Sequence, residues 1–367
     1  MKTNLDHRTL AEAVAWTTRF IAQRPAVPVL AGVLLAADGD KVTLSVFDYD
    51  VSARCTIPAD IAEPGVVLLP GRVLAEITKS LPARPVEMAL SGSEVEIVCG
   101  SAKFGLLTMP ADDYPTLPGA PAEIGTVDAA VLRDAITQVH HAASNDDTLP
   151  MLTGIRLDNH GGQLNLATTD RYRIAHRELS WQPTVVGAQH AALIPARVLH
   201  DIARGLTPGL DVHLGLDDKQ ASVTNGGRTT TVRLLDPQFI DYRARLDDDM
   251  PTWATLDVAP FADAIKRVAL VAEKNTAVRL SFDDGQVLVQ AGGGDVGRGA
   301  ETVACHLDGP PLDIAFQPHY LVEAVVAAGV TAEQVRIGMH APNRPALVAV
   351  PGESPDFREL VMSLRLA

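Results

Sequence analysis

The chain has 367 residues, of which 47% are hydrophobic and 21% are charged, and its formal net charge is −14. This length exceeds the size at which a single core keeps growing, so two or three domains are expected. No apolar run reaches the roughly 20 residues that span a bilayer, and the first residues lack the apolar stretch of a signal peptide. The three cysteines, Cys55, Cys99 and Cys305, have no disulfide or zinc-site spacing. We therefore expect a cytoplasmic protein with reduced thiols, no membrane association and no cofactor or metal.

The predicted elements repeat three times along the chain. Each repeat opens with an amphipathic helix behind an N-cap candidate, which is Asp6, Asp128 or Asp257. A strand hairpin, a second helix opened by proline, and a further pair of short strands then follow. The hairpin segments cover 32–57, 154–179 and 277–303, with starts 122 and 123 residues apart, and the second helices are expected over 70–81, 195–206 and 318–329.

Two linkers, in which periodicity lapses, separate these repeats. They lie at the proline-rich 114–123 and at 246–254. The sequence therefore predicts an α+β fold of three tandem modules, at 1–120, 121–250 and 251–367, each with helices on one side and sheet on the other.

Positive charge is concentrated on the predicted helices, although the whole chain is acidic. The basic residues of these helices and their ends are Arg8, Arg19, Arg24, Arg72, Lys79, Arg197, Arg204, Lys266, Arg267 and Lys274. Acidic residues gather in turns and linkers, as in 38–40 and 247–249. This distribution either presents a positive surface to a phosphate backbone or marks ordinary solvated helix faces, and charge alone does not separate the two.

Helix dimensions add a geometric expectation. Six modules with two helices each, every helix about 10 Å across, would line a ring with an opening of about 28 Å, which is enough for a duplex. Three modules cannot close such a ring. A head-to-tail pair of chains is therefore implied.

Three features invite other functions. The glycine-rich 292–299 lacks the spacing of a phosphate-binding loop and is interpreted as a loop. His140 and His141 lie near Asp146 and Asp147, but adjacent histidines point to different helix faces, so a metal site is disfavoured. No nucleophile motif supports an enzyme. A repeat-built scaffold that binds peptides without encircling DNA remains the main alternative.

Several motifs together resemble the bacterial DNA polymerase III β subunit, the sliding clamp. They are RPAVPVLAGVLL (24–35), FGLLTMPADDYPTLP (104–118), TDRYRIA (169–175), FIDYR (239–243), NRPALVAVP (343–351) and VMSLRLA (361–367). The resemblance implies a homodimeric ring around double-stranded DNA, without sequence specificity or catalysis. It also implies a clamp loader, and replicative and repair polymerases held through clamp-binding peptides.

The resemblance carries specific residues with it. It implies DNA contacts at Arg24, Arg72 and Arg197, and a dimer interface at Phe104, Leu106, Ala269 and Leu270. A partner-binding pocket between the second and third modules is implied at Leu152, Thr169, Arg171, Tyr172, Arg173, Ile240, Arg245, Asn275, Gln317, Tyr320, Ala346, Val361, Met362, Ser363, Leu364, Arg365 and Leu366. An apolar cleft of this kind accepts a short extended peptide with leucine or phenylalanine anchors.

The chain also departs from the family pattern. Segment 145–150 lacks the basic and aromatic residues that touch DNA in some members, and Ile240 and Ser363 replace prolines at the pocket. Ala244, Arg245 and Asn275 are further departures. Two readings stay open: a specialised clamp that tolerates pocket-directed inhibitors, a form of antibiotic resistance, or lineage drift without a change in ligand preference.

Overall fold

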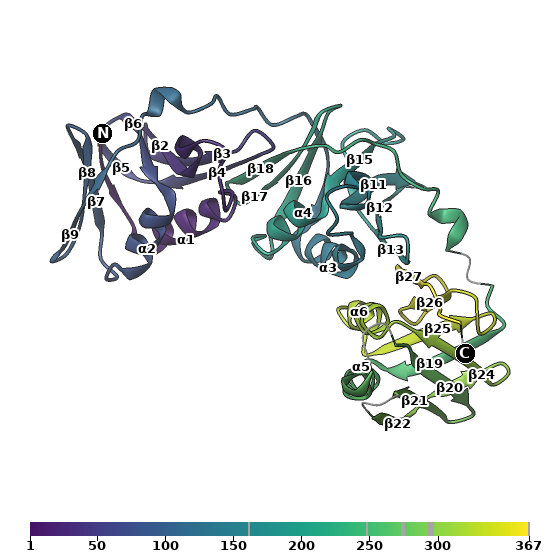
Figure 1. The fold of residues 1–367 in the computed structure, drawn as a ribbon. Helices are drawn as coiled ribbons and strands as arrows, with labels where there is room; N and C mark the ends of the chain where they lie inside the picture. Colours follow the sequence, from purple (N-terminus) through teal and green to yellow (C-terminus); the bar gives the residue numbers. More distant parts are fainter. Residues whose placement is uncertain (161, 247–248, 273–275, 293–296, 366–367) are drawn as a thin grey trace. The chain divides into compact units, whose positions relative to one another are not determined.

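The structure is a computed structural model that describes residues 1–160, 162–246, 249–272, 276–292 and 297–365. Its α-helices are α1 (His7–Thr18), α2 (Gly71–Ser80), α3 (Ala129–Val139), α4 (Ala196–Ala203), α5 (Val258–Val268) and α6 (Pro318–Ala328). Short 3-10 helices are η1 (Pro28–Ala31), η2 (Ala111–Asp113), η3 (His140–Ala142), η4 (Pro150–Leu152), η5 (Arg243–Arg245) and η6 (Ala269–Val271). The chain divides into two compact units, which are described separately (Figure 1).

The first unit comprises Met1–Ala129, Gln182–Val185 and Arg204–Leu234. Its five-stranded sheet has the order β5-β1-β7-β8-β9, with β5 (Asp60–Glu63), β1 (Lys2–Leu5), β7 (Val86–Ser91), β8 (Glu94–Cys99) and β9 (Ala102–Leu107). Its nine-stranded sheet has the order β14-β10-β16-β17-β18-β4-β3-β2-β6. These strands are β14 (Gln182–Pro183), β10 (Glu123–Asp128), β16 (Asp211–Leu216), β17 (Gln220–Asn225), β18 (Arg228–Arg233), β4 (Val51–Pro58), β3 (Lys41–Phe47), β2 (Gly32–Asp38) and β6 (Gly65–Pro70).

The second unit comprises Ala130–Trp181, Val186–Ala203 and Leu235–Ala367. Its nine-stranded sheet has the order β15-β11-β12-β13-β27-β26-β25-β19-β23, and its four-stranded sheet has the order β22-β21-β20-β24. The strands are β15 (Ala191–Pro195), β11 (Gly154–His160), β12 (Gln163–Thr169), β13 (Arg173–Leu179), β27 (Phe357–Val361), β26 (Ala346–Ala349), β25 (Gln334–Met339), β19 (Thr252–Asp257), β23 (His306–Asp308), β22 (Arg298–Ala304), β21 (Gln286–Gly292), β20 (Val278–Asp283) and β24 (Leu312–Phe316).

Strand pairing joins the sequence repeats. β4 of the first repeat pairs antiparallel with β18 of the second, and β13 of the second pairs in the same way with β27 of the third. Each pairing continues one sheet across a repeat boundary, which is why the compact units cut through the second repeat. The module boundaries 1–120, 121–250 and 251–367 therefore stay a prediction.

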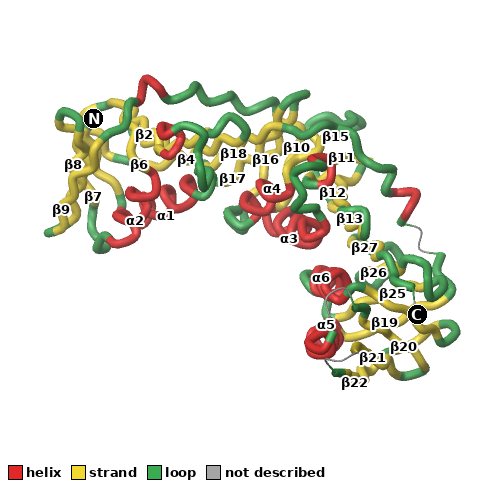
Figure 2. The backbone as a smooth tube through the Cα atoms, viewed as in Figure 1, coloured by secondary structure: helices red, strands yellow, loops and turns green. Residues whose placement is uncertain are grey.

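The helices form as the periodicity predicts, and each buries one apolar face. Leu10 and Val14 of α1, and Phe261 and Ile265 of α5, are buried. α1 packs beside α2, and α5 beside α6, as Figure 2 shows for the red segments. α4 ends at Ala203, three residues before the predicted limit.

Of two predicted N-cap side chains, one caps its helix and the other does not. The Asp6 side chain accepts a hydrogen bond from the backbone N–H of Thr9 at 2.8 Å, which confirms it as the cap of α1. Asp257 precedes α5 but caps no backbone donor of that helix, because its carboxylate accepts a hydrogen bond from Gln334 instead.

Candidate functional site

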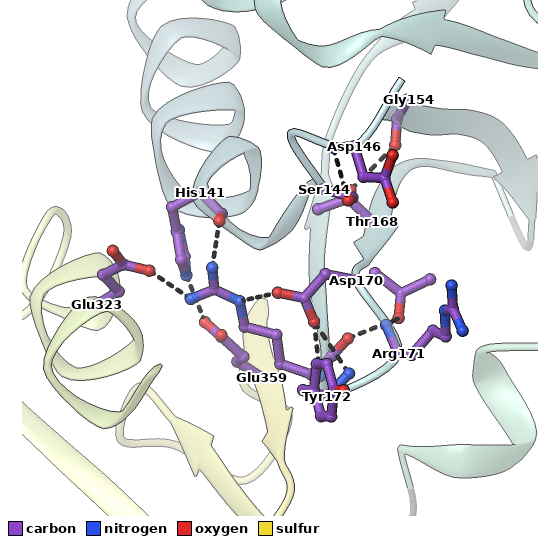
Figure 3. Close-up of polar contacts among 12 residues, drawn as sticks. His141, Ser144, Asp146, Gly154, Thr168, Asp170, Arg171, Tyr172, Glu323 and Glu359 are labelled. Atoms are coloured by element: carbon purple, nitrogen blue, oxygen red, sulfur yellow. Dashed lines mark hydrogen bonds and ion pairs between the residues drawn. The ribbon is translucent and has the colours of Figure 1, made fainter. Parts of the chain in front are cut away.

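The turn between β12 and β13 is organised by two polar side chains. Asp170 Oδ1 accepts hydrogen bonds from the backbone N–H groups of Tyr172 at 3.0 Å and Arg173 at 3.2 Å. Thr169 Oγ1 accepts one from the Arg171 N–H at 3.2 Å and donates to the Arg173 carbonyl at 2.6 Å. Arg171 has a φ of +80°, so the chain reverses direction there, as the sticks in Figure 3 show.

Arg173 is buried, and its guanidinium is surrounded by acceptors. Its Nε donates to Asp170 at 2.9 Å, its Nη1 to Glu323 at 2.5 Å, and its Nη2 to the His141 carbonyl oxygen. Burial lowers the pKa of Arg173, but the charge of Glu359 and the contacts with Glu323 and Asp170 outweigh it, so the pKa is raised. Arg173 therefore ties β13 to η3 and α6.

Further buried polar groups lie on both faces of these strands, with Glu359 on the face of Arg173 and His176 on the opposite face. Glu359 on β27 is fully buried, and its Oε2 lies 2.9 Å from His141 Nε2. His176 Nε2 lies 2.8 Å from the Asn165 side-chain oxygen. Burial, and then the charge of nearby arginines led by Arg358, lower the pKa of His176 to about 3. His176 is therefore neutral at physiological pH.

The face of these strands away from Arg173 carries an apolar cluster beside His176. The register places Ile174 opposite Leu360, and Leu360 opposite Leu347, so these three side chains share one face. They belong to the apolar cluster, whose buried members are Ala167, Ile174, Tyr242, Leu246 and Leu347 and whose partly buried members are Phe239, Ile240, Met250, Trp253 and Leu360. Sequence reasoning found Ile240 in this group and missed Ile174, Leu246, Leu347 and Leu360.

An aromatic pair lies next to the turn. The rings of Tyr172 and Tyr320 stack with centroids 5.8 Å apart, and Tyr172 is 58% exposed. The Arg173 guanidinium lies 4.7 Å from the centroid of the Tyr320 ring. The Met362 N–H donates to the Tyr172 carbonyl at 2.9 Å, and the Leu364 N–H to that of Ala315 at 2.7 Å. The first bond holds the C-terminal segment against the turn, and the second holds it against β24.

The predicted pocket residues fall into three groups. Partly or fully exposed are Arg171, Tyr172, Ile240, Arg245, Gln317, Tyr320, Met362, Ser363, Leu364 and Arg365, and buried are Leu152, Thr169, Arg173, Ala346 and Val361. Asn275 and Leu366 lie outside the described residues. Ala346 and Val361 pair with each other, and Val361 with Arg173, so both lie on the face away from the apolar cluster. Being fully buried, they present no surface to a ligand.

The predicted basic contacts are exposed. Arg24 lies just before η1 and Arg72 at the start of α2, and Arg72 donates to the carbonyl oxygen of Gln23 at 2.9 Å. Arg197 is exposed on α4.

Three of the other predicted helix cations have acidic partners. They are Arg8 with Glu12, Lys266 with Asp263, and Arg267 with Glu301. Lys274 lies outside the described residues.

The residues predicted for an interface between chains lie at sheet edges. β9 and β22 are edge strands of their sheets. Phe104 is exposed on β9, whereas Leu106 is only 8% exposed and its neighbour Leu107 is 66% exposed. Ala269 is partly buried and Leu270 is strongly exposed in η6. Leu106 therefore packs within its own sheet, and Leu107 is an exposed residue that the sequence did not single out.

The histidine pair does not converge on one point. His141 faces Glu359, whereas the His140 ring stacks on His200 with centroids 4.2 Å apart. The described residues contain no group of three or more side chains suited to a metal ion. Positions 293–296 of the glycine-rich segment lie outside the described residues. No helix in the described part of the chain is long and apolar enough to cross a membrane.

Comparison with known proteins gives one consistent answer. Residues 1–118, 126–241 and 246–365 match, in order, the N-terminal, central and C-terminal domain families of the DNA polymerase III beta subunit. The beta sliding clamp of Streptomyces coelicolor is 42% identical over 377 residues and covers 100% of both chains. The beta sliding clamp homolog GriR of Streptomyces muensis is 40% identical over 327 residues, 89% of this chain and 88% of the relative.

Solved structures agree over the whole length. A Pseudomonas aeruginosa sliding clamp bound to griselimycin superposes with a TM-score of 0.93 at 27% identity, covering 100% of both chains. The Bacillus subtilis sliding clamp gives a TM-score of 0.92 at 25% identity, also over 100% of both chains. With three domain matches in order and a full-length relative at 42% identity, the chain belongs to the bacterial DNA polymerase III beta subunit family, the beta sliding clamps.

Proposed function

We propose that two copies of this chain join head to tail into a ring around duplex DNA in the cytoplasm and tether polymerases to it. As a sliding clamp, the chain is a non-catalytic processivity factor of DNA replication. The observation that carries the proposal is the succession of three clamp domains over residues 1–365, in a chain fully covered by its 42% identical relative.

Exposed apolar side chains at two sheet edges support the dimer. β9 carries exposed Phe104 and Leu107 on opposite faces of the strand, with Leu106 buried on the face of Phe104, and η6, next to β22, carries Ala269 and exposed Leu270. An unpaired edge with apolar side chains favours pairing with another chain. Light scattering should show a species near twice the 39.0 kDa chain mass. A stable monomer at micromolar concentration would contradict the ring.

The DNA contacts are proposed to be weak and independent of sequence. Arg24, Arg72 and Arg197 are exposed and would meet the phosphate backbone. Because such contacts act by releasing counterions, binding to linear duplex should fall steeply with salt. The triple alanine variant should load less efficiently in the presence of an ATP-driven clamp loader, with unchanged far-UV circular dichroism. Tight, sequence-specific binding would contradict a sliding role.

The partner-binding pocket is proposed to lie at the turn between β12 and β13, where Ile174 of the apolar cluster follows Tyr172 of the Tyr172–Tyr320 pair by two residues. Apolar side chains beside a stacked aromatic pair suit an extended peptide with leucine or phenylalanine anchors. Clamp loader and polymerases would compete for this one surface. A polymerase-derived peptide should displace the clamp loader in a competition assay.

We further propose that this pocket is altered relative to other clamps and tolerates pocket-directed inhibitors. Griselimycin is bound in a solved clamp of the same fold, and the beta sliding clamp homolog GriR is 40% identical to this chain. Ile240 packs against the apolar cluster, and Ser363 lies between two residues held by backbone hydrogen bonds. A proline at either position would fix φ near −65° and stiffen the wall. Lineage drift without a change in ligand preference is the competing account.

Calorimetric titration separates these accounts. A polymerase-derived peptide and griselimycin are each titrated into the wild-type chain and into the Ile240→Pro, Ser363→Pro double variant. Loss of one apolar contact is worth about 1 to 3 kcal/mol, roughly 5- to 150-fold in affinity. Griselimycin should therefore bind the double variant more tightly, while the peptide changes less. Equal affinities of both proteins for both ligands would leave drift as the account.

A further inference from the structure

Residues 235–246, here called the wall segment, lie between β18 and β19 and border the proposed pocket. Ile240 packs against the apolar cluster, and Tyr242 is a buried member of it. The Leu235 N–H donates to the Leu193 carbonyl at 2.9 Å, which holds the first residue of the segment. Further polar contacts, made by side chains, attach the segment to β11. The position of Ile240 therefore depends on these side-chain contacts.

Asp158 on β11 is the centre of these contacts. It is only 8% exposed, accepts a hydrogen bond from the Tyr242 hydroxyl at 3.2 Å, and forms an ion pair with Arg243. The Nε of Arg156 lies 3.5 Å from its other carboxylate oxygen, and Arg156 Nη1 donates to the Pro237 carbonyl at 3.0 Å. Because Arg156 and Asp158 are two residues apart on one strand, they share a face. One buried carboxylate therefore secures the wall segment at two points, one directly and one through Arg156.

Tyr242 transmits this attachment to the apolar part of the wall segment. The Arg243 guanidinium lies 4.6 Å from the centroid of its ring, and the ring of Phe239 packs edge-on against it with centroids 6.2 Å apart. Burial, and then the charge of Asp158, raise the pKa of Tyr242, so its hydroxyl keeps the proton that it donates. Because Ile240 lies between Phe239 and Tyr242 in the chain, fixing these two rings also fixes Ile240.

The first repeat attaches its linker without such a carboxylate. At the hairpin spacing of 122 residues, Asp158 corresponds to the uncharged Ala36. The hydroxyl oxygen of Tyr114 accepts a hydrogen bond from the Phe47 N–H at 2.8 Å, and Arg54 Nη2 donates to two linker carbonyl oxygens at 3.3 and 3.0 Å. A linker can therefore dock on its own repeat without a buried acid. Since burying a carboxylate costs free energy unless it is paired, its presence beside the proposed pocket points to a role there.

We propose that Asp158 is a positioning residue of the peptide pocket, which holds the wall segment so that Ile240 is preset to contact the apolar anchor of a docked peptide. This inference rests on the proposed peptide-binding function. Being buried, Asp158 does not contact the peptide itself. A preset wall lowers the conformational entropy that docking must remove, and so raises affinity. The effect of Asp158 on binding should therefore depend on Ile240.

A double-mutant cycle tests this dependence. The affinity of a polymerase-derived peptide with leucine and phenylalanine anchors is measured by calorimetry for the wild-type chain, Asp158→Asn, Ile240→Ala and the double variant. Asp158→Glu, which keeps the charge, is the conservative variant. Should Asp158→Asn not fold, Tyr242→Phe, which removes only the donating hydroxyl, replaces it in the cycle. The matched control is Arg54→Gln, which loosens the linker of the first repeat.

Asp158→Asn should weaken peptide binding roughly 5- to 30-fold, as expected when one apolar contact is weakened. Asp158→Glu should recover most of this loss, and Arg54→Gln should bind like the wild type. In the Ile240→Ala background, Asp158→Asn should change the affinity by less than about 2-fold.

Two results would overturn the inference while leaving the pocket in place. One is wild-type affinity in Asp158→Asn, or in Tyr242→Phe where it replaces that variant. The other is an undiminished loss from Asp158→Asn when Ile240 is already alanine, because the carboxylate would then act on the fold in general. If the wild-type chain does not bind the peptide, the proposed pocket itself fails, and this inference fails with it.

Discussion

We expect Arg173 to make a large contribution to the stability of the paired strands β13 and β27. In Arg173→Met the aliphatic length is kept, but the fully buried Glu359 loses its compensating charge, and so does Asp170. Glu323, with 44% of its side chain exposed, can be hydrated again. Breaking a buried charge pair costs about 3 to 5 kcal/mol. Because water can solvate Glu323, one of the three acidic partners, we expect Arg173→Met to lower the free energy of unfolding by about 3 kcal/mol, the lower end of that range.

Hydrogen exchange followed by mass spectrometry measures this cost locally. Amides of β13 and β27 should exchange roughly 150-fold faster in Arg173→Met, which corresponds to about 3 kcal/mol. Glu323→Gln serves as the matched control, since an exposed pair contributes about 1 kcal/mol or less. Amides of β20 and β21, in the separate four-stranded sheet, should be unchanged in both variants. Equal acceleration in Arg173→Met and Glu323→Gln would refute the reasoning.

Three further predictions concern acid stability, self-association and helix capping. The pKa of His176 lies at about 3, below the unfolded value of 6.5, so stability is fully present above pH 6.5 and is lost as the pH falls toward 3. Urea unfolding should show a loss of about 2 kcal/mol between pH 7 and 5, and His176→Gln should show a smaller one; identical losses would contradict this assignment. Leu107→Ser should raise the dimer dissociation constant in sedimentation at unchanged thermal stability, whereas Leu106→Ser should lower the melting temperature, and the reverse pattern would exclude the proposed edge. Asp6→Ala should cost about 1 kcal/mol in chemical unfolding through loss of the α1 cap, a result that an Asp257→Ala control should not reproduce.

Much of the fold follows from sequence periodicity. The apolar spacing of Leu10 and Val14, repeated at Phe261 and Ile265, located two helices whose buried faces match. The threefold repeat located the hairpins because alternation and turn chemistry are local signals. The continuous sheets across repeats could not be predicted in this way, since strand pairing between distant segments leaves no local pattern.

At the pocket, the sequence does not predict which side chains share a face of the sheet and which are exposed. Leu360 and Val361 are both apolar neighbours, so nothing in their identity tells which one shares a face with Ile174, and only the strand register decides it. Arg171 and Arg173 are two residues apart, and regular alternation would place them on the same face. The positive φ of Arg171 breaks that alternation and separates an exposed cation from a buried one.

The central claim is that the chain acts as a closed ring around DNA. The most direct measurement loads the protein with a clamp loader onto a nicked circular plasmid, isolates the complex by gel filtration, and then linearises the DNA with a restriction enzyme. A ring should stay on the circle at a salt concentration that abolishes binding to linear duplex, and should run off once the circle is cut. Equal retention on circular and linear DNA, or no retention on either, would contradict encirclement and favour a peptide-binding scaffold.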